Sequence, residues 1–237
     1  EMAAIRFNVT AAAGREIHRA TLRLRRASDD DLRYIRISTV NQDWAEGAAT
    51  APYSPPDGAT YQYADAGRQT PWSWPGSQFC DVVMGAGNTL AQWAERAEAD
   101  EGWISVQIAA DMVYAMVAGD TDGIAIMDGG NPAFANNFIH SAQSPGNAPY
   151  IEVDLGDALP TAIGAPTLTV EPAPEAARMD AGALRVVISP VDHIFAWRVW
   201  VDGDRVPRWR VPHPRRGEDT VFVLDNLSPL VAHTVEA

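Results

Sequence analysis

The residues best suited to chemistry in this chain are aromatic side chains gathered in one stretch, residues 41–79. Tryptophan occurs there at Trp44, Trp72 and Trp74, among several tyrosines and prolines. The flat face of an indole ring buries well against an apolar surface, while its edge tolerates polar groups, which suits stacking on a sugar. These three side chains are therefore candidate carbohydrate contacts. The alternative is that they hold the stretch against the body of the domain.

A second candidate group lies just upstream, on the outward side of a strand expected over Leu32–Val40. Tyr34 and Arg36 alternate there with isoleucines. An arginine can grip a carboxylate or sulfate through two parallel hydrogen bonds; alternatively it lies on a solvated face and pairs with nearby acids. Because this strand runs directly into the aromatic stretch, we expect the returning loop to fold over the same outward face. The predicted site combines Tyr34 and Arg36 with Trp72.

Metal binding has one weak candidate group, the acids Asp120, Asp122 and Asp128 beside glycine turns. Calcium takes six to eight oxygen ligands, and the spacing of these acids matches no complete loop motif. Asx-turns, in which the side chain bonds to its own backbone, explain such residues as well. We expect no cofactor, with a structural calcium ion as the alternative.

The motifs of common enzyme classes are absent from the sequence. It contains no nucleophile elbow, no zinc-protease motif and no phosphate loop, and Cys80 has no histidine close by in sequence. Paired carboxylates of the glycosidase type stay open, because 31 acidic residues produce many chance pairs. The chain is therefore predicted not to be an enzyme, and a polysaccharide hydrolase or lyase is the third-ranked alternative.

Charge is spread unevenly along the chain. The formal net charge is −13, and every basic residue is an arginine. Residues 1–40 carry +3, residues 41–165 carry −14 and residues 166–237 carry −2. Nucleic acids and anionic membranes need a basic footprint, so this balance argues against both. No apolar run approaches the roughly 18 residues of a membrane span.

A fragment of a larger extracellular or cell-surface protein is the expected context. The chain opens in strand-like sequence, without a signal peptide. The single cysteine excludes an internal disulfide framework, although a large sandwich can be exported without one. We therefore expect polysaccharide as a partner, with neighbouring domains or a second chain at open strand edges.

The elements that must position these residues are mostly short strands separated by Gly/Pro turns, which indicates a β-sandwich. In the first part of the chain we expect strands over Glu1–Thr10, Ala20–Arg26, Leu32–Val40, Trp103–Ile108, Ile124–Met127, Phe134–His140 and Tyr150–Leu155. Two short helices are expected over Thr89–Ala97, where apolar residues recur at i, i+3, i+4 and i+7, and over Asp111–Ala118, where Gly119 would end the helix.

A second unit is expected after a patternless stretch of small residues, which we take as a linker over 158–165. The first domain then covers 1–157 and the second 166–237. Strands of the second domain are expected over Thr167–Val170, Ala183–Ser189, Phe195–Val201, Val206–Val211, Thr220–Leu224 and Ala232–Ala237. The fold class is all-β: an antiparallel, jelly-roll-like sandwich and a smaller one.

The first unit resembles the DNRLRE-type carbohydrate-binding module over roughly residues 3–156. The resemblance is carried, in order, by the segments AAIRFNV, IHRATLRLR, DWAEGAAT, GATY, WSWPGSQF, GWISVQI and FIHSAQSPGNAPYIEVDL. It implies a β-sandwich found beside polysaccharide-active domains of secreted microbial proteins. Tyr61 stands where that family usually has tryptophan, and Ser77 stands where it usually has glycine.

The second unit is similar to a fibronectin type III domain. The resemblance is carried by Ala183–Pro190, FAWRVWVDGDRVP, and LDNLSPLVAHTVEA near the end. It implies an immunoglobulin/fibronectin-like sandwich whose last strand is missing. The two resemblances together predict a non-catalytic fragment that binds polysaccharide, acidic or sulfated in one version, and spaces neighbouring domains. The alternative is a purely structural or adhesive scaffold of a cell surface or filament.

Overall fold

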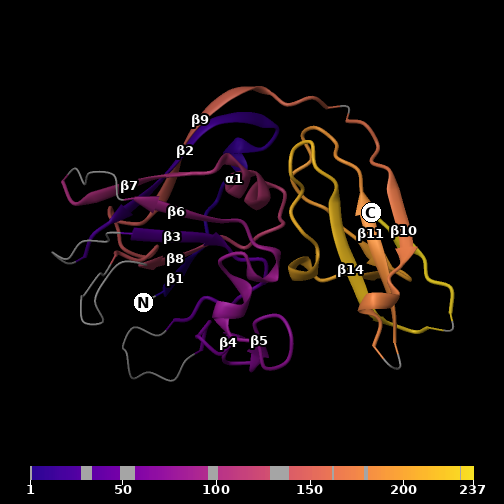
Figure 1. The fold of residues 1–237 in the computed structure, drawn as a ribbon. Helices are drawn as coiled ribbons and strands as arrows, with labels where there is room; N and C mark the ends of the chain where they lie inside the picture. The colour runs from indigo at the N-terminus through magenta and orange to yellow at the C-terminus, as the bar shows by residue number, and fades with distance from the viewer. Residues whose placement is uncertain are drawn as a thin grey trace. The chain divides into compact units, whose positions relative to one another are not determined.

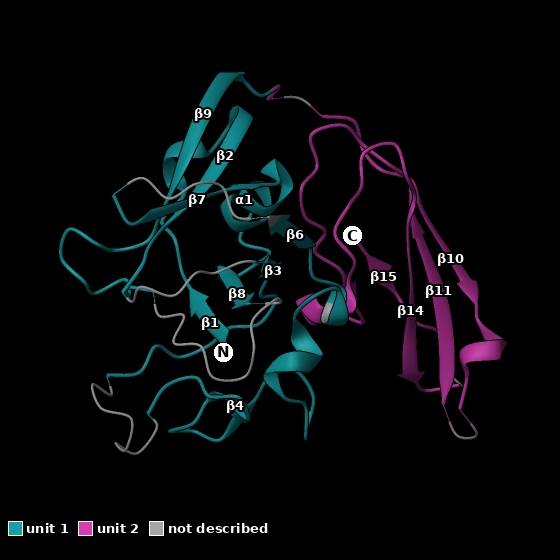
Figure 2. Ribbon diagram, turned by 60° about the vertical axis from the view of Figure 1, so that its left-hand side comes forward, with its two compact units in different colours: residues 1–159 teal, residues 160–237 magenta. Residues whose placement is uncertain are grey.

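The computed structural model describes residues 2–27, 34–48, 57–95, 101–128, 139–161, 163–178, 181–229 and 231–237. The chain divides into two compact units, residues 1–159 and 160–237 (Figure 2). The division falls inside the segment 158–165 that the sequence marks as a linker. Every strand pairing among the described residues is antiparallel, so the fold is all-β, as the alternating patterns predict.

Unit 1 contains a four-stranded sheet in the order β1-β8-β3-β6. Its strands are β1 (Met2–Ile5), β8 (Ile124–Asp128), β3 (Tyr34–Thr39) and β6 (Ala91–Glu95). One side of this sheet is buried, because alternate residues such as Ile35, Ile37 and Ile126 are at most 4% exposed. The opposite side carries Arg36 and is called the outer face below. Alternation along β3 was the basis for predicting this division, and it is confirmed.

A second sheet of unit 1 has the order β7-β2-β9. It is formed by β7 (Trp103–Ile108), β2 (Arg15–Arg25) and β9 (Tyr150–Ala158). Leu22, Leu24 and Ile104 on its inner side are fully buried. Figure 1 shows this sheet above the four-stranded one. The Gln92 side chain of β6 links the two layers, because it donates to the Gln107 carbonyl at 2.8 Å and accepts from the Ala109 amide at 2.7 Å.

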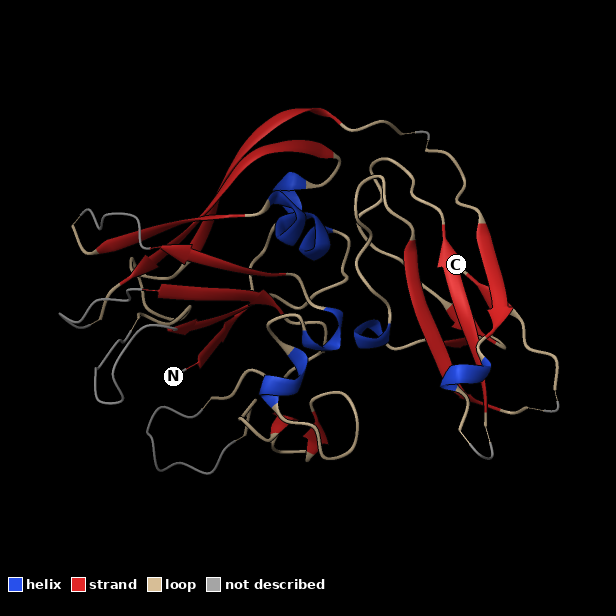
Figure 3. Ribbon diagram, viewed as in Figure 1, coloured by secondary structure: helices blue, strands red, loops and turns tan. Residues whose placement is uncertain are grey.

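One short helix, α1 (Ala110–Val117), lies beside the ends of these strands, as expected over 111–118 (Figure 3). Met112 and Val113 are buried, and the Tyr114 hydroxyl accepts a hydrogen bond of 2.7 Å from the Ile17 amide. Gly119 follows the helix at φ +69°, a left-handed conformation that ends helices readily. None of the described helices has the length and apolarity that a bilayer crossing demands.

The helix predicted over Thr89–Ala97 is wrong, because the described part of this segment forms strand β6. Its residues pair with β3 in register, with Trp93 opposite Arg36 and Ala94 opposite Ile35. The helical spacing of apolar residues is outweighed by the hydrogen bonds that β3 offers to a neighbouring strand. The strand predicted over Phe134–His140 lies mostly outside the described residues, although Ile139 bridges to Arg26.

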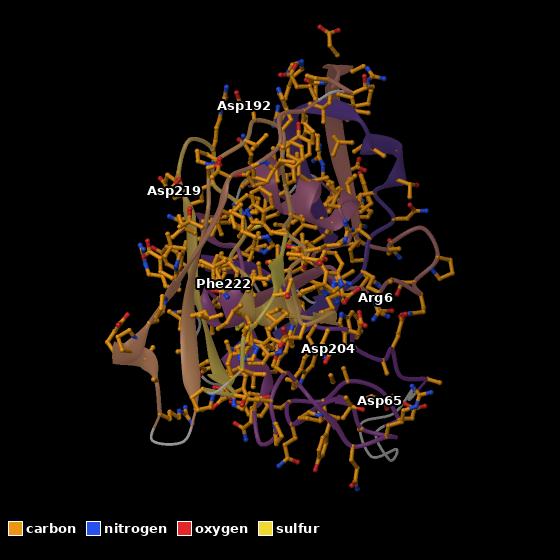
Figure 4. The ribbon with its side chains drawn as sticks, turned by 90° about the vertical axis from the view of Figure 1, so that its right-hand side faces the viewer. Arg6, Asp65, Asp192, Asp204, Asp219 and Phe222 are labelled. Atoms are coloured by element: carbon orange, nitrogen blue, oxygen red, sulfur yellow. The ribbon has the colours of Figure 1, made fainter. Side chains whose placement is uncertain are left out.

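Unit 2 consists of two three-stranded sheets, β10-β11-β14 and β13-β12-β15. The first sheet contains β10 (Leu168–Pro172), β11 (Gly182–Ile188) and β14 (Thr220–Leu227), and the second contains β13 (Asp204–Arg205), β12 (Trp200–Val201) and β15 (Val235–Glu236). Val186, Trp197 and Phe222 lie in their common core (Figure 4 labels Phe222). The Trp197 indole donates to the Thr220 hydroxyl at 3.0 Å. Strand β15 is an edge strand, paired with β12.

The strand predicted over Val206–Val211 is wrong, because a 3₁₀ turn over Arg208–Arg210 interrupts it. Proline fixes the backbone dihedral φ and removes the amide hydrogen at Pro207, so a ladder cannot continue there. Val206 and Val211 at the two ends of the segment are nevertheless buried in the core. The apolar residues that this burial requires at both ends are what made the segment resemble a strand in the sequence. The strand predicted over Phe195–Val201 is also shorter in the structure, where β12 covers Trp200–Val201.

His233 ties the segment before β15 to the turn after β12. Its Nδ1 lies 2.6 Å from Oδ2 of Asp202, and its Nε2 lies 2.9 Å from the Ser228 carbonyl oxygen. The Thr234 amide donates to the other Asp202 oxygen at 2.9 Å. Both ring nitrogens therefore face acceptors, and only the doubly protonated ring can donate to both. The bonds to Asp202 and then to Ser228 raise the pKa of His233 above its ordinary 6.5.

We expect this arrangement to make the stability of unit 2 depend on pH. A raised pKa stabilises the fold fully below pH 6.5, and the contribution is lost as pH rises through the folded-state pKa. The bond to His233, followed by that to Thr234, lowers the pKa of Asp202 below 3.8, so its contribution is lost only as pH falls through that lowered value. Urea unfolding of the wild type and of His233→Gln between pH 5 and 9 checks this. The wild-type advantage should shrink as pH rises, and a constant difference would contradict it.

Candidate functional site

The described parts of the aromatic stretch, residues 41–48 and 57–79, form a loop that packs on one end of the outer face, as the order of elements predicts. It contains two small strands, β4 (Tyr63–Asp65) and β5 (Thr70–Pro71). Backbone hydrogen bonds tie its two sides together, from the Ala45 amide to the Ala64 carbonyl at 2.8 Å and from the Ala59 amide to the Ala45 carbonyl at 2.7 Å. These described parts of the loop therefore hold one another in place and can present side chains in defined positions.

A close backbone approach inside the loop requires glycine on both sides. A Cβ atom on Gly58 would lie 2.2 Å from the Gly47 nitrogen, and one on Gly47 would lie 2.6 Å from Oδ1 of Asp57. The Asp57 carboxylate accepts from the Ala48 amide at 3.1 Å. These contacts hold the entrance of the loop near residues 57–58, where the chain returns toward the sheet.

Trp72 is not a surface contact, which corrects the central element of the predicted site. Its side chain is 1% exposed and packs on Phe79 with ring centroids 4.7 Å apart. The cluster around it includes Val40 and Ala125 of the sheet. Its indole nitrogen donates to the Thr60 carbonyl at 2.8 Å. Trp72 is therefore the centre of a small core between the loop and the sheet.

Trp44 and Trp74 lie in different environments. Trp44 is half-buried, its indole donates to the Asp122 carbonyl at 3.0 Å, and the Arg6 guanidinium lies 4.3 Å from its ring centroid (Figure 4 labels Arg6). These contacts hold the Trp44 side chain against the sheet, which indicates a structural role. Trp74 is 38% exposed and begins a tight turn in which the Ser77 amide donates to its carbonyl at 3.0 Å. Of the three tryptophans predicted for the site, Trp74 thus presents the most surface.

Tyr34 and Arg36 lie on the outer face, as predicted, on the half of β3 away from Val40 and the Trp72 cluster. Tyr34 is 51% exposed. Arg36 pairs across the strands with Trp93, and its guanidinium carbon lies 3.8 Å from the Trp93 ring centroid, a cation–π distance. Trp93 is 59% exposed. We call Tyr34, Arg36 and Trp93 the platform.

The chemistry of the platform follows from the state of Arg36. Its Nε atom is buried without a hydrogen-bond partner, and within the described ranges no carboxylate forms an ion pair with it. The Trp93 ring contacts the Arg36 guanidinium and is still 59% exposed. The platform therefore offers one cation with an unmatched charge and two aromatic surfaces, a combination suited to a ring that carries an anion.

A cavity of about 320 Å³ opens where the loop meets the first strand. The side chains around it include Met2, Ala4, Ala59, Tyr61, Trp72 and Phe79. A neighbouring cleft of about 540 Å³ shares Tyr61 with it. The cleft is bounded mainly by uncharged polar groups, among them Thr60, Gln62, Tyr63, Gln69 and Gln78. The two hollows thus join an apolar floor to a polar rim.

Tyr61 stands between the two hollows and is 48% exposed. Its hydroxyl donates to Sγ of Cys80 at 3.0 Å, and this bond is the main cause that raises the pKa of the tyrosine above 10.0. The phenol proton is thus engaged by Cys80, and the Tyr61 oxygen is left as a hydrogen-bond acceptor at the edge of the cavity. Tyr61 entered the sequence interpretation as a departure from a family pattern, and the structure places it at the rim of the cavity.

The three candidate calcium ligands do not come together. Asp120 and Asp122 lie in the turn before β8, whereas Asp128 ends that strand, about 20 Å from Asp122 at roughly 3.3 Å per extended residue. Among the residues that the structure describes, no group of three His, Cys, Asp or Glu side chains is arranged to hold a metal ion. The turn instead locks onto β3, because the Asp122 amide donates to the Val40 carbonyl at 2.8 Å.

Sequence reasoning missed Trp93, the most exposed aromatic side chain on the platform. The spacing of apolar residues in this segment predicts a helix, and on that helix Trp93 would belong to the buried face. In the strand, Gln92 and Ala94 face the buried side of the sheet. Neither has the large apolar side chain that normally indicates a buried strand face, so the alternation is not visible in the sequence. A signal was nevertheless present, because Trp93 precedes the confirmed strand β7 by ten residues, within the length of a strand–turn–strand connection.

Comparison with known protein families, curated proteins and solved structures finds no match for this chain.

Proposed function

We propose that unit 1 binds polysaccharide without catalysis, taking an acidic or sulfated sugar on the platform. The observation that carries the proposal is Trp93, 59% exposed and stacked on an arginine that has no ion pair in the described structure. Tyr34, on the same face of β3, extends the aromatic surface. Neighbouring exposed aromatic side chains often mark a binding surface, and the arginine between them can bind an anion.

The charge distribution supports an anionic ligand at this position. Residues 1–40 carry +3 within a chain of net charge −13, and Arg36 lies in that basic segment. The acidic majority of the chain, −14 over residues 41–165, would repel a polyanion at other sites. Unit 2, with its two antiparallel sheets, serves as a spacer in this proposal. In this proposal the protein acts outside the cell or at its surface.

Affinity electrophoresis in gels containing polygalacturonate, dextran sulfate or neutral dextran tests the proposal. The wild type should be retarded by an anionic polymer, and Trp93→Ala should weaken that affinity by about tenfold, or roughly 1.4 kcal/mol. Arg36→Gln should also remove most of the dependence on salt concentration. Tyr150→Ala is the matched control, because Tyr150 is 47% exposed on a strand of the other sheet.

Two outcomes would contradict a glycan site on the platform. If no polymer retards the wild type, or if Tyr150→Ala weakens binding as much as Trp93→Ala does, the platform is not a glycan site. The structural alternative, a scaffold or adhesive unit, would then account for the two sandwiches. Turnover of a retained polymer would instead point to the third alternative, a hydrolase or lyase.

A further inference from the structure

The cavity and the platform are connected by one row of residues that crosses the four-stranded sheet. Trp93 pairs with Arg36, Arg36 with Met127, and Met127 with Met2. Directly paired residues lie on the same side of a sheet, so all four belong to the outer face. Met2 is 38% exposed and also borders the cavity. Three strand spacings of about 4.8 Å separate the two ends of this row by about 14 Å.

The two ends of the row differ in chemistry. The platform end carries the cation of Arg36, whereas none of the described residues that line the cavity or the cleft is charged. The cavity is lined mainly by apolar side chains, among them Met2 and Ala4 of the first strand, with the largely buried rings of Trp72 and Phe79 behind them. A cavity of about 320 Å³ lies at the lower end of the usual range for small-ligand sites, about 300–1,000 Å³. This end suits an uncharged group with an apolar part.

Two glutamines at the rim supply amide groups with free bonding capacity. Gln62 and Gln69 are exposed, and neither side chain forms a hydrogen bond within the described ranges. Each amide can donate two hydrogen bonds and accept others. Gln78 differs, because it is half-buried and begins the 3₁₀ turn Phe79–Val82, where its backbone amide donates to the Asp81 carboxylate at 2.8 Å. Primary amides in the cleft beside an apolar cavity complement an acetamido group, whose methyl can enter the cavity while its N–H and C=O meet the glutamines.

We infer that the polysaccharide bound by unit 1 alternates acidic and N-acetylated neutral sugars, with the neutral sugar held at the cavity below Tyr61. The inference rests on the proposed function, because it needs the acidic sugar on the platform. Between the platform and the cavity, the polysaccharide would lie along the row of side chains that includes Met127 and Met2. A ligand of this kind satisfies the cation at one end and the neutral amides at the other. A uniformly acidic chain would bring a charge onto the apolar floor, at a cost in desolvation.

Calorimetric titration of the full chain with three oligosaccharides of equal length tests this. Hyaluronan oligosaccharide alternates uronate and N-acetylglucosamine, oligogalacturonate is acidic throughout, and chitin oligosaccharide is neutral and N-acetylated throughout. The hyaluronan probe should bind about tenfold more tightly than either of the others. The double variant Gln62→Ala/Gln69→Ala should lose that advantage, while its affinity for oligogalacturonate stays unchanged. Gln107→Ala, a glutamine exposed on β7, is the matched control and should change nothing.

The outcomes separate this inference from the proposed function. Equal affinity for hyaluronan and galacturonate oligosaccharides, with both weakened by Trp93→Ala, overturns the alternating ligand and leaves the platform intact. Loss of galacturonate affinity in the glutamine double variant also overturns it, because the rim would then serve acidic sugars. Absence of binding to all anionic probes overturns the proposed function itself. Thermal unfolding of each variant confirms that surface substitutions leave the fold unchanged, since such changes usually stay within about 0.5 kcal/mol.

Discussion

Replacing Trp72 by alanine should lower the free energy of unfolding of unit 1 by about 3–5 kcal/mol, the usual cost of removing a large buried aromatic side chain. Trp72 is 1% exposed, and the cluster around it joins the loop to β3 and β8. The substitution also leaves the Thr60 carbonyl without the 2.8 Å hydrogen bond that the indole donates. Urea unfolding of the full chain followed by circular dichroism measures the loss.

Trp93→Ala is the matched control for this prediction, because it removes the same side chain from an exposed position. Trp93 is 59% exposed, so its removal should cost at most about 1 kcal/mol, the scale of the cation–π contact with Arg36. The two variants should therefore have opposite profiles. Trp72→Ala should lose stability, and Trp93→Ala should lose glycan affinity. If Trp72→Ala is as stable as Trp93→Ala, the loop core contributes little.

The second large effect is expected at Gly123, the residue before β8. Its φ of +109° lies in a region that side chains rarely adopt, and an added Cβ would lie 2.2 Å from the Ile5 carbonyl oxygen. Since that contact is with backbone, Gly123→Ala must displace β1 from β8 at the pair Ile5 and Ile124. The strained backbone alone costs about 1–3 kcal/mol, and lost strand pairing adds to it. Denaturant unfolding of the variant measures the total.

Two other glycines separate the contributions to that cost. Gly76 also has a positive φ, +87°, but a Cβ there meets nothing within 4 Å. Gly164 has neither a positive φ nor a neighbour within that distance. Gly76→Ala should therefore show the backbone penalty alone, and Gly164→Ala should be close to neutral. A Gly123→Ala variant no less stable than Gly76→Ala would contradict the close contact with Ile5.

Alternation along the chain predicted most of the sheet structure, because burial of one face leaves a direct record in the sequence. The isoleucines of β3 and the leucines of β2 face inward, with arginines between them. The loop was located by the opposite signal, loss of any period among many aromatic residues. Its placement over the outer face followed from connectivity, and the packing of Val40 and Ala125 beneath it agrees.

The site was predicted less well, because exposure of an aromatic residue is decided by contacts far away in the sequence. Trp72 and Trp93 are the same residue type, and nothing local distinguishes the buried one from the exposed one. Trp72 is buried by Phe79 and by the sheet. Trp93 is exposed because β6 is the last strand of its sheet and pairs on one side with β3. Tyr34 and Arg36 were predicted to face outward because an alternating strand fixes that from local sequence.

The hydrogen bond between Tyr61 and Cys80 has a practical consequence for measuring ligand binding at the cavity. Cys80 is the chain's one thiol, it is exposed, and its partner borders both the cavity and the cleft. A maleimide dye would therefore attach at a single position, directly beside the rim. Its emission would report on water leaving that rim, and a bound chain would slow the labelling reaction. The molecule thus carries a built-in place for a spectroscopic probe, without any engineered residue.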